Sequence, residues 1–125
     1  MAVTLETAAR NAACNAVVDL VDNSGPGDLV FETSGDAEVA TLPFSATAFG
    51  AAAAGVATAD TITDDSSATG GTIAQASFYD GVPTKVLECS VTATGGGGDI
   101  EISSLVVGAG DTVSCSSLTV TMPAT

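Results

Sequence analysis

The residue types of this chain change abruptly near position 25, and this change constrains the fold more than any other feature. Residues 4–22 contain no Gly or Pro and are rich in Ala, which is typical of a helix. The turn-forming sequence NSGPG at 23–27 ends that segment. From residue 28 onward, short alternating runs rich in Thr, Val and Ser predict β-strands separated by turns. We therefore expect one N-terminal α-helix followed by a mainly β region.

The helical segment also predicts where the helix begins and which side it buries. Thr4 is the expected N-cap, and Glu6 is expected in the first turn, where a carboxylate is favourable. Apolar residues at helical spacing form the expected core-facing stripe: Leu5, Ala9, Ala12, Ala16 and Leu20, with Val17 and Val21 beside them. The opposite, polar side is expected to face solvent: Glu6, Arg10, Asn11, Asn15, Asp19 and Asp22.

Seven strands are expected in the remainder of the chain. They span residues 29–33, 37–44, 56–62, 73–79, 84–91, 100–107 and 112–122. Asp80-Gly81 predicts a tight hairpin turn, and residues 50–55, 64–71, 95–98 and 108–111 are expected to be loops. The expected fold is an antiparallel β-sandwich or jelly-roll-like domain with one N-terminal α-helix, and its strand order does not follow from the sequence.

The length of 125 residues fits a single domain, with helix and linker in 1–27 and the β-sandwich in 28–125. Hydrophobic residues make up 46% of the chain, but most are Ala and Val, which bury little area each. A core this thin gains stability by burial against other surfaces. We therefore expect a homo-oligomer, a dimer or a trimer, or docking on a partner.

The last two expected strands contain a short internal repeat, ISSLVV at 102–107 and CSSLTV at 115–120. In each copy, the apolar residues change from even to odd positions, or the reverse, across the Ser-Ser pair. A β-bulge or a strand that crosses between sheets would require such a change. Chance similarity in a segment rich in Ser, Thr and Val is the alternative.

The net charge of −13 comes from 15 acidic residues against only Arg10 and Lys85. This charge repels phosphate groups, so neither nucleic acid nor an anionic membrane is an expected partner. No apolar stretch approaches the roughly 20 residues that span a bilayer. Residues 1–6 lack the basic and apolar regions of a secretory signal, so we expect folding in a cytoplasm.

The three cysteines, Cys14, Cys89 and Cys115, have no CxxC spacing, and a cytoplasm keeps thiols reduced. We expect them to be small buried hydrophobes, with the Cys14 thiol inert near the apolar side of the helix. Strand alternation turns Cys89 toward the inner face, together with Leu87 and Val91. Cys89 and Cys115 would suit neighbouring strands, but the sequence does not decide whether they pair.

Residue types that support catalysis or metal binding are scarce. The chain has no His, which removes Ser-His-Asp and Cys-His arrangements and His metal ligands. The densest acidic cluster consists of Asp60, Asp64 and Asp65. We favour a solvated loop over a site of acid-base catalysis. A Ca²⁺ site is also disfavoured, because the spacing of an EF-hand is absent. The glycines at 95–98 lack the Lys-Ser/Thr of a phosphate loop. We expect no catalytic, cofactor-binding or metal-binding residues, and no enzyme.

Four segments carry a resemblance to a known family: TAARNAACNAVVDLVD, FGAAAAGVATADTIT, VLECSV and VSCSSLTVTMPA. In their order and spacing, the chain resembles small virion proteins from the structural modules of tailed bacteriophages, of the head decoration or cement type. The resemblance implies a β-rich subunit made in the host cytoplasm that binds the major capsid protein on the capsid exterior and bridges capsomers. It supplies no catalytic or cofactor residues.

Two other roles stay open. One is a tail- or fibre-associated virion protein, although only short hairpins are expected here. The other is a host-surface or carbohydrate-binding module, against which the small number of aromatic residues counts. For a decoration subunit, we expect fewer acidic residues on the capsid-facing side than on the outer side, because apolar contacts must offset the mutual repulsion of the subunits.

Overall fold

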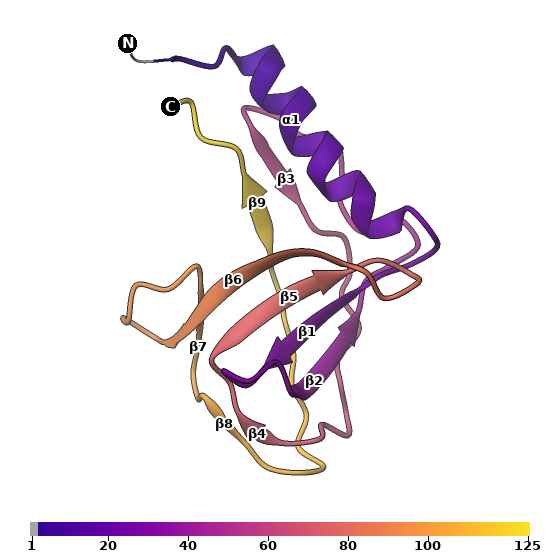
Figure 1. Ribbon diagram of the computed structural model, residues 1–125, viewed down its shortest axis with the longest axis vertical. Helices are drawn as coiled ribbons and strands as arrows, with labels where there is room; N and C mark the ends of the chain where they lie inside the picture. The colour runs from indigo at the N-terminus through magenta and orange to yellow at the C-terminus, as the bar shows by residue number, and fades with distance from the viewer. Residues whose placement is uncertain (1–2) are drawn as a thin grey trace.

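The computed structural model describes residues 3–125. Its elements follow the chain in this order: α1 (Thr7–Asp19), the 3-10 turn η1 (Leu20–Asp22), β1 (Asp28–Glu32), β2 (Glu38–Pro43), β3 (Val56–Thr58), β4 (Gly71–Thr72), β5 (Gln75–Tyr79), β6 (Lys85–Ala93), β7 (Ile100–Ile102), β8 (Val106–Val107) and β9 (Thr119–Thr121). Figure 1 shows α1 beside β3 and β9 at one end of the molecule, with the larger sheet below. Within the described residues, no helix is long and apolar enough to cross a membrane.

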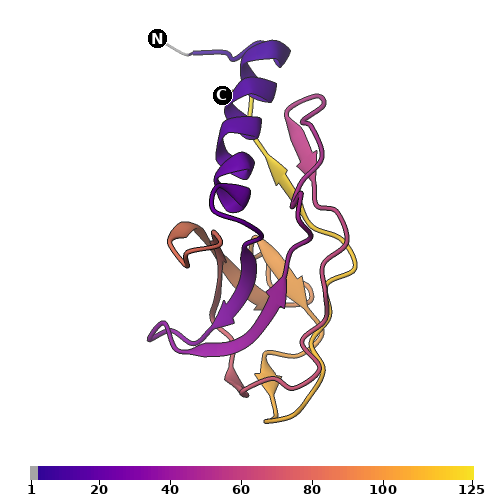
Figure 2. The ribbon, with the colours of Figure 1, turned by 90° about the vertical axis from the view of Figure 1, so that its right-hand side faces the viewer.

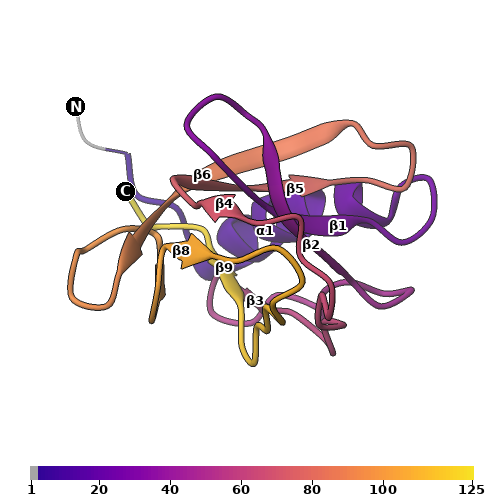
Figure 3. The same ribbon diagram turned by 90° about the horizontal axis from the view of Figure 1, so that it is seen from below.

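The main sheet has five strands in the order β2-β1-β5-β6-β7. The pairs β1–β2, β1–β5 and β5–β6 are antiparallel, whereas β6–β7 is parallel. Two further pairs, β3–β9 and β4–β8, are antiparallel, and β3 and β9 lie in a second layer on one side of the main sheet (Figure 3). The expected mainly β, sandwich-like fold with an N-terminal helix is therefore confirmed, with one parallel pair in place of a fully antiparallel sheet.

The core lies between these layers and uses the few aromatic residues of the chain. Phe44, Phe49 and Phe78 form a mutual cluster with ring centroids 5.5 to 5.9 Å apart. Leu29 and Phe31 point into it from β1 and are almost completely buried. Most aromatic rings therefore fill the interior.

The helix begins later than expected. Thr7 is its first residue and Glu6 is the N-cap, without a side-chain capping hydrogen bond. The prediction of Thr4 as N-cap, with Glu6 in the first turn, is therefore wrong. The expected end is correct, because η1 stops at Asp22 directly before the NSGPG turn.

The helix buries a different face from most of the expected stripe. Of the expected residues, Val21 is buried and Leu5 and Val17 are partly buried, whereas Ala9, Ala12, Ala16 and Leu20 are exposed. Cys14 and Val18 are the other buried residues of the helix. The buried residues lie on the opposite side of the helix from these exposed alanines and Leu20. Figure 2 shows the helix beside β9, with β3 on the far side of β9.

Hydrogen bonds explain this orientation. The Asn11 and Asn15 side-chain oxygens accept hydrogen bonds from the backbone N–H groups of Gly55 (2.7 Å) and Ala52 (2.8 Å). Arg10 Nε donates to the Met122 carbonyl at 2.9 Å. The second layer presents unpaired backbone groups here, and burying them without partners would be costly. Arg10, Asn11 and Asn15 therefore pack inward, whereas Glu6 and Asp19 face solvent as expected, together with most of the alanines.

The two C-terminal strands are shorter than expected and divided. The segment 100–107 breaks into β7, which pairs with β6, and β8, which pairs with β4. Within 112–122, Val113 pairs with Asp65, while β9 pairs with β3. The change of parity at each Ser-Ser pair therefore corresponds to a chain that crosses between sheets, as one of the two expectations stated.

The β5–β6 hairpin exists, but its turn is not the expected two-residue type. Residues 80–84 connect the strands, and the Asp80 carboxylate accepts hydrogen bonds from the N–H groups of Val82 (3.0 Å) and Thr84 (2.7 Å). Gly81 is required for a different reason, because a Cβ there would lie 2.3 Å from the Ser24 carbonyl oxygen. The hairpin loop thus packs on the turn that follows the helix.

Candidate functional site

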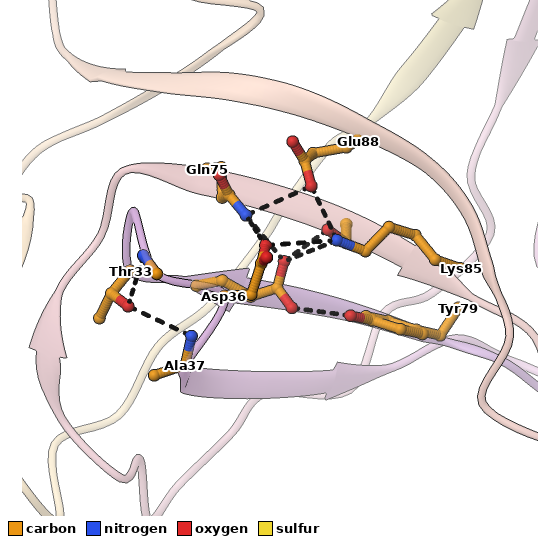
Figure 4. A network of polar contacts seen from close by, with 10 residues as sticks. Thr33, Asp36, Ala37, Gln75, Tyr79, Lys85 and Glu88 are labelled. Atoms are coloured by element: carbon orange, nitrogen blue, oxygen red, sulfur yellow. Dashed lines mark hydrogen bonds and ion pairs between the residues drawn. The ribbon is translucent and has the colours of Figure 1, made fainter.

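A buried carboxylate lies on the outer face of the main sheet. Glu32 of β1 is 3% exposed, and its oxygens accept hydrogen bonds from Ser77 Oγ at 2.5 Å and the Tyr79 hydroxyl at 2.8 Å. Lys85 Nζ lies 3.7 Å from Glu32 Oε1. Figure 4 shows Lys85 and Tyr79 in this network, with Asp36, Gln75 and Glu88 around the Lys85 ammonium. We call this set, with Asp36, Gln75 and Glu88, the Glu32 network.

Strand register brings the network together. Glu32 is opposite Gln75 on β5, and Ser77 is opposite Glu88 on β6. Alternate residues of a strand share a face, so Gln75, Ser77 and Tyr79 all point outward beside Glu32. Residues that are far apart in sequence therefore meet through the order of three strands.

Lys85 neutralises much of this acidic group. Its Nζ lies 2.7 Å from Glu88, 3.5 Å from Asp36 and 3.7 Å from Glu32, and 5.8 Å from the centroid of the Tyr79 ring. The hydrogen bond to Glu88 is the main cause that raises the pKa of Lys85. The hydrogen bond to Glu32 and burial raise the pKa of Tyr79. Both groups keep their protons at neutral pH, which suits a structural network better than proton transfer.

The network also contains a geometry that suits cations. Glu32, Asp36 and Glu88 each offer one oxygen within 4.8 Å of the others, the one such acidic group among residues 3–125. A Ca²⁺ ion requires six to eight oxygen ligands, and the Lys85 ammonium already lies beside all three carboxylates. The chain therefore supplies its own cation at this position.

An open hollow of about 320 Å³ lies next to the network and is lined by Asp28, Glu38, Thr41, Tyr79 and Pro83, among others. Burial raises the pKa of Asp28. The outer face of the main sheet and its rim therefore carry five acidic residues: Asp28, Glu32, Asp36, Glu38 and Glu88. This face is strongly negative and suits neither phosphate nor another anionic ligand.

The acidic residues selected from the sequence serve local structure. The Asp65 carboxylate accepts hydrogen bonds from the N–H groups of Thr41 and Ser67, both at 2.9 Å. Asp60 accepts one from the Thr61 N–H, and Asp64 is exposed. The structure therefore does not join Asp60, Asp64 and Asp65 into one site, and Asp65 instead covers part of the free edge of β2.

The glycine loop at 95–98 is held by side chains around it. The Glu101 carboxylate accepts hydrogen bonds from the N–H groups of Gly95 (3.3 Å) and Gly97 (2.9 Å). Thr92 Oγ1 accepts one from the Gly98 N–H at 3.0 Å. A carboxylate of the chain thus occupies the place that an anionic ligand would need.

All three cysteines are free. Cys14 is completely buried, and its thiol donates a hydrogen bond to the Val120 carbonyl at 3.3 Å. Cys89 faces the core as expected, but Cys115 lies outside any strand, so the two are not on neighbouring strands. Burial raises the pKa of Cys89 to about 11 and also raises that of Cys115. Both are therefore protonated, weakly nucleophilic thiols at neutral pH.

The second candidate surface is the exposed side of the helix, which we call the outer helix face. It consists of Ala9, Ala12, Ala16 and Leu20, and the Leu20 residue is 49% exposed. None of these residues is charged, in contrast to the outer face of the main sheet. An uncharged apolar strip on an acidic protein is a candidate contact surface.

Sequence reasoning missed the Glu32 network and the polar helix contacts. A signal existed for the first, because Lys85 is one of only two cations and follows directly after the hairpin, but its partners depend on strand order. No family model, no curated protein and no solved structure matches the chain. We therefore infer a function from the surfaces of the chain itself.

Proposed function

We propose that this protein is a decoration, or cement, subunit that binds the major capsid protein on the outside of a tailed-phage head and bridges capsomers. The observation that carries the proposal is the outer helix face. Ala9, Ala12, Ala16 and Leu20 form an apolar strip that the rest of the chain leaves uncovered. Such a strip gains stability when a partner covers it.

The distribution of charge supports the same assignment. The outer face of the main sheet carries Asp28, Glu32, Asp36, Glu38 and Glu88, whereas the exposed side of the helix carries only Asp19 and, at the N-cap, Glu6. A subunit that docks through the helix would hold its acidic sheet away from the capsid. Neighbouring copies would then repel one another least where they touch the lattice.

Imaging of labelled particles tests the proposal. An antibody against the chain, applied to virions of the phage that encodes it, should mark the head surface at regular intervals. Label on the tail or fibres would favour the tail-associated alternative. Absence of the chain from purified virions, or reproducible binding to a glycan array, would refute the decoration role.

A pair of matched variants tests the contact surface. Leu20→Glu places a charge on the outer helix face, and we expect it to weaken binding to chain-depleted heads about tenfold. Val82→Glu is the control, because Val82 is 60% exposed, lies in the β5–β6 loop and receives the same change of charge. Equal binding by the two variants would show that the helix is not the contact surface.

A further inference from the structure

Strand β9 has one free edge. On the other side it pairs with β3, with Val120 opposite Ala57. The Ala59 N–H donates to the Leu118 carbonyl and the Met122 N–H to the Gly55 carbonyl, both at 2.8 Å. Bonded and non-bonded pairs alternate in an antiparallel ladder, so Val120 directs its backbone groups to β3. Thr119 and Thr121 therefore direct their N–H and C=O groups away from β3, where the described residues supply no partner.

Other strand edges of the fold carry specific blocks. Along β2, the Asp65 carboxylate accepts the outward N–H of Thr41, and along β6 the Asp99 carboxylate accepts that of Ser90. A register shift opposite Phe78/Tyr79 further distorts the edge of β6. Charged side chains and bulges of this kind prevent edge-to-edge pairing. Strand β9 has neither, because its sequence is Thr-Val-Thr and its register with β3 is unbroken.

The sequence around β9 reads nearly the same in both directions: Leu118-Thr119-Val120-Thr121-Met122. If two copies pair antiparallel about Val120, each Thr119 lies opposite a Thr121 and each Leu118 lies opposite a Met122. Thr–Thr and apolar cross-strand pairs are favourable. The segment therefore matches itself under twofold symmetry, as an isologous dimer contact requires.

The surroundings also allow a second copy to approach. Residues 112–125 contain no charged residue, in a chain with a net charge of −13. A hollow of about 220 Å³ adjoins β9 and is lined by Leu87, Cys89, Thr119 and Thr121, among others. Figure 1 shows β3 to the right of β9, and Figure 2 shows α1 and β3 on opposite sides of β9. The strand thus brings no charge of its own to the contact, and Asp99 is the one charged residue that lines the hollow.

We propose that two copies of this chain associate by antiparallel pairing of their β9 strands about Val120. Thr119 and Thr121 of each copy then form four backbone hydrogen bonds with the other copy, and a continuous four-stranded β3-β9-β9-β3 sheet results. The inference rests on the strand edges alone. It is independent of the capsid role, so a failure of one leaves the other standing.

Sedimentation equilibrium of the purified full chain tests the pairing. We expect a dimer that tightens as salt increases, because salt screens the repulsion between two acidic copies. In the double variant Thr119→Glu/Thr121→Glu, like charges oppose one another across both pairs, and the dissociation constant should rise about tenfold or more. In Thr119→Glu/Thr121→Lys, the same two positions place opposite charges across each pair, and the dimer should return.

Three outcomes would overturn the proposal: a wild-type chain that stays monomeric at millimolar concentration and high salt, a wild-type trimer, or a dimer that the Glu/Glu variant leaves unchanged. A measurement without substitutions covers the case in which a variant does not fold. Amide hydrogen exchange at Thr119 and Thr121 should slow as the wild-type concentration rises. Exchange that does not depend on concentration would likewise refute β9 pairing.

Discussion

Replacement of Glu32 by Ala is the most direct test of how the main sheet is held together. The carboxylate is 3% exposed and accepts hydrogen bonds from Ser77, which is completely buried, and from Tyr79. Glu32→Ala removes the acceptor and leaves a buried hydroxyl without a partner. It also removes one of the three carboxylates beside Lys85.

The expected loss follows from these contacts. A buried hydrogen bond to a charged acceptor, here from Ser77, contributes about 1.5–3 kcal/mol. The partly exposed Tyr79 bond adds about 1 kcal/mol, and the ion pair with Lys85, whose side chain is 33% exposed, adds at most about 1 kcal/mol. Relief of repulsion with Asp36 and Glu88 offsets about 1 kcal/mol. The free energy of unfolding should fall by about 2–4 kcal/mol in total.

Urea unfolding followed by circular dichroism measures this loss. For a domain of this size, it corresponds to a fall in Tm of roughly 8–16 °C. Glu88→Ala is the matched control, since the Glu88 side chain is 45% exposed and its removal should change the free energy by less than about 1 kcal/mol. If Glu32→Ala also loses less than about 1 kcal/mol, the network does not stabilise the sheet as argued.

Two further predictions concern pH and the glycine loop. Burial raises the pKa of Cys89 to about 11, and an unfolded thiol titrates near about 8.5. Because the pKa is higher in the folded state, the protonated Cys89 thiol makes its full contribution to the free energy of unfolding below about pH 8.5. That contribution is lost as pH rises toward 11. Urea midpoints of Cys89→Ala should decline less over this range than those of the wild type, and parallel declines would contradict the assignment. Glu101→Ala should speed amide exchange at Gly95 and Gly97 in NMR spectra while leaving the unfolding midpoint unchanged; unchanged exchange would show that Glu101 does not hold the loop.

The helix shows where sequence patterns mislead. Its extent was predictable from residues that favour or end helices. Its orientation was not, because Ala9, Ala12 and Ala16 gain little from burial, whereas Asn11 and Asn15 satisfy backbone N–H groups of the second layer. The spacing of apolar residues predicts which side has the larger apolar area. It does not contain the positions of unpaired backbone groups on the surface that the helix packs against.

The strands show the opposite balance. Alternation located β1, β2, β5 and β6 to within a few residues. The change of parity at the Ser-Ser pairs left a β-bulge, a crossing between sheets and chance similarity open, and the structure has the crossing. The partner of each strand depends on contacts between distant parts of the chain, which no local pattern contains. The Glu32 network was therefore out of reach, because it requires β5 to lie between β1 and β6.

The contacts of the helix also have a consequence for the order of events during synthesis. Arg10 bonds to a residue 112 positions later, and Cys14 to one 106 positions later. The helix is thus synthesised before every strand it packs against and is among the last elements to find its place. Until β9 emerges, the surface that covers the buried side of the helix is incomplete, because β3 supplies only part of it. The nascent chain must keep Val18 and Val21 from other partners throughout that interval.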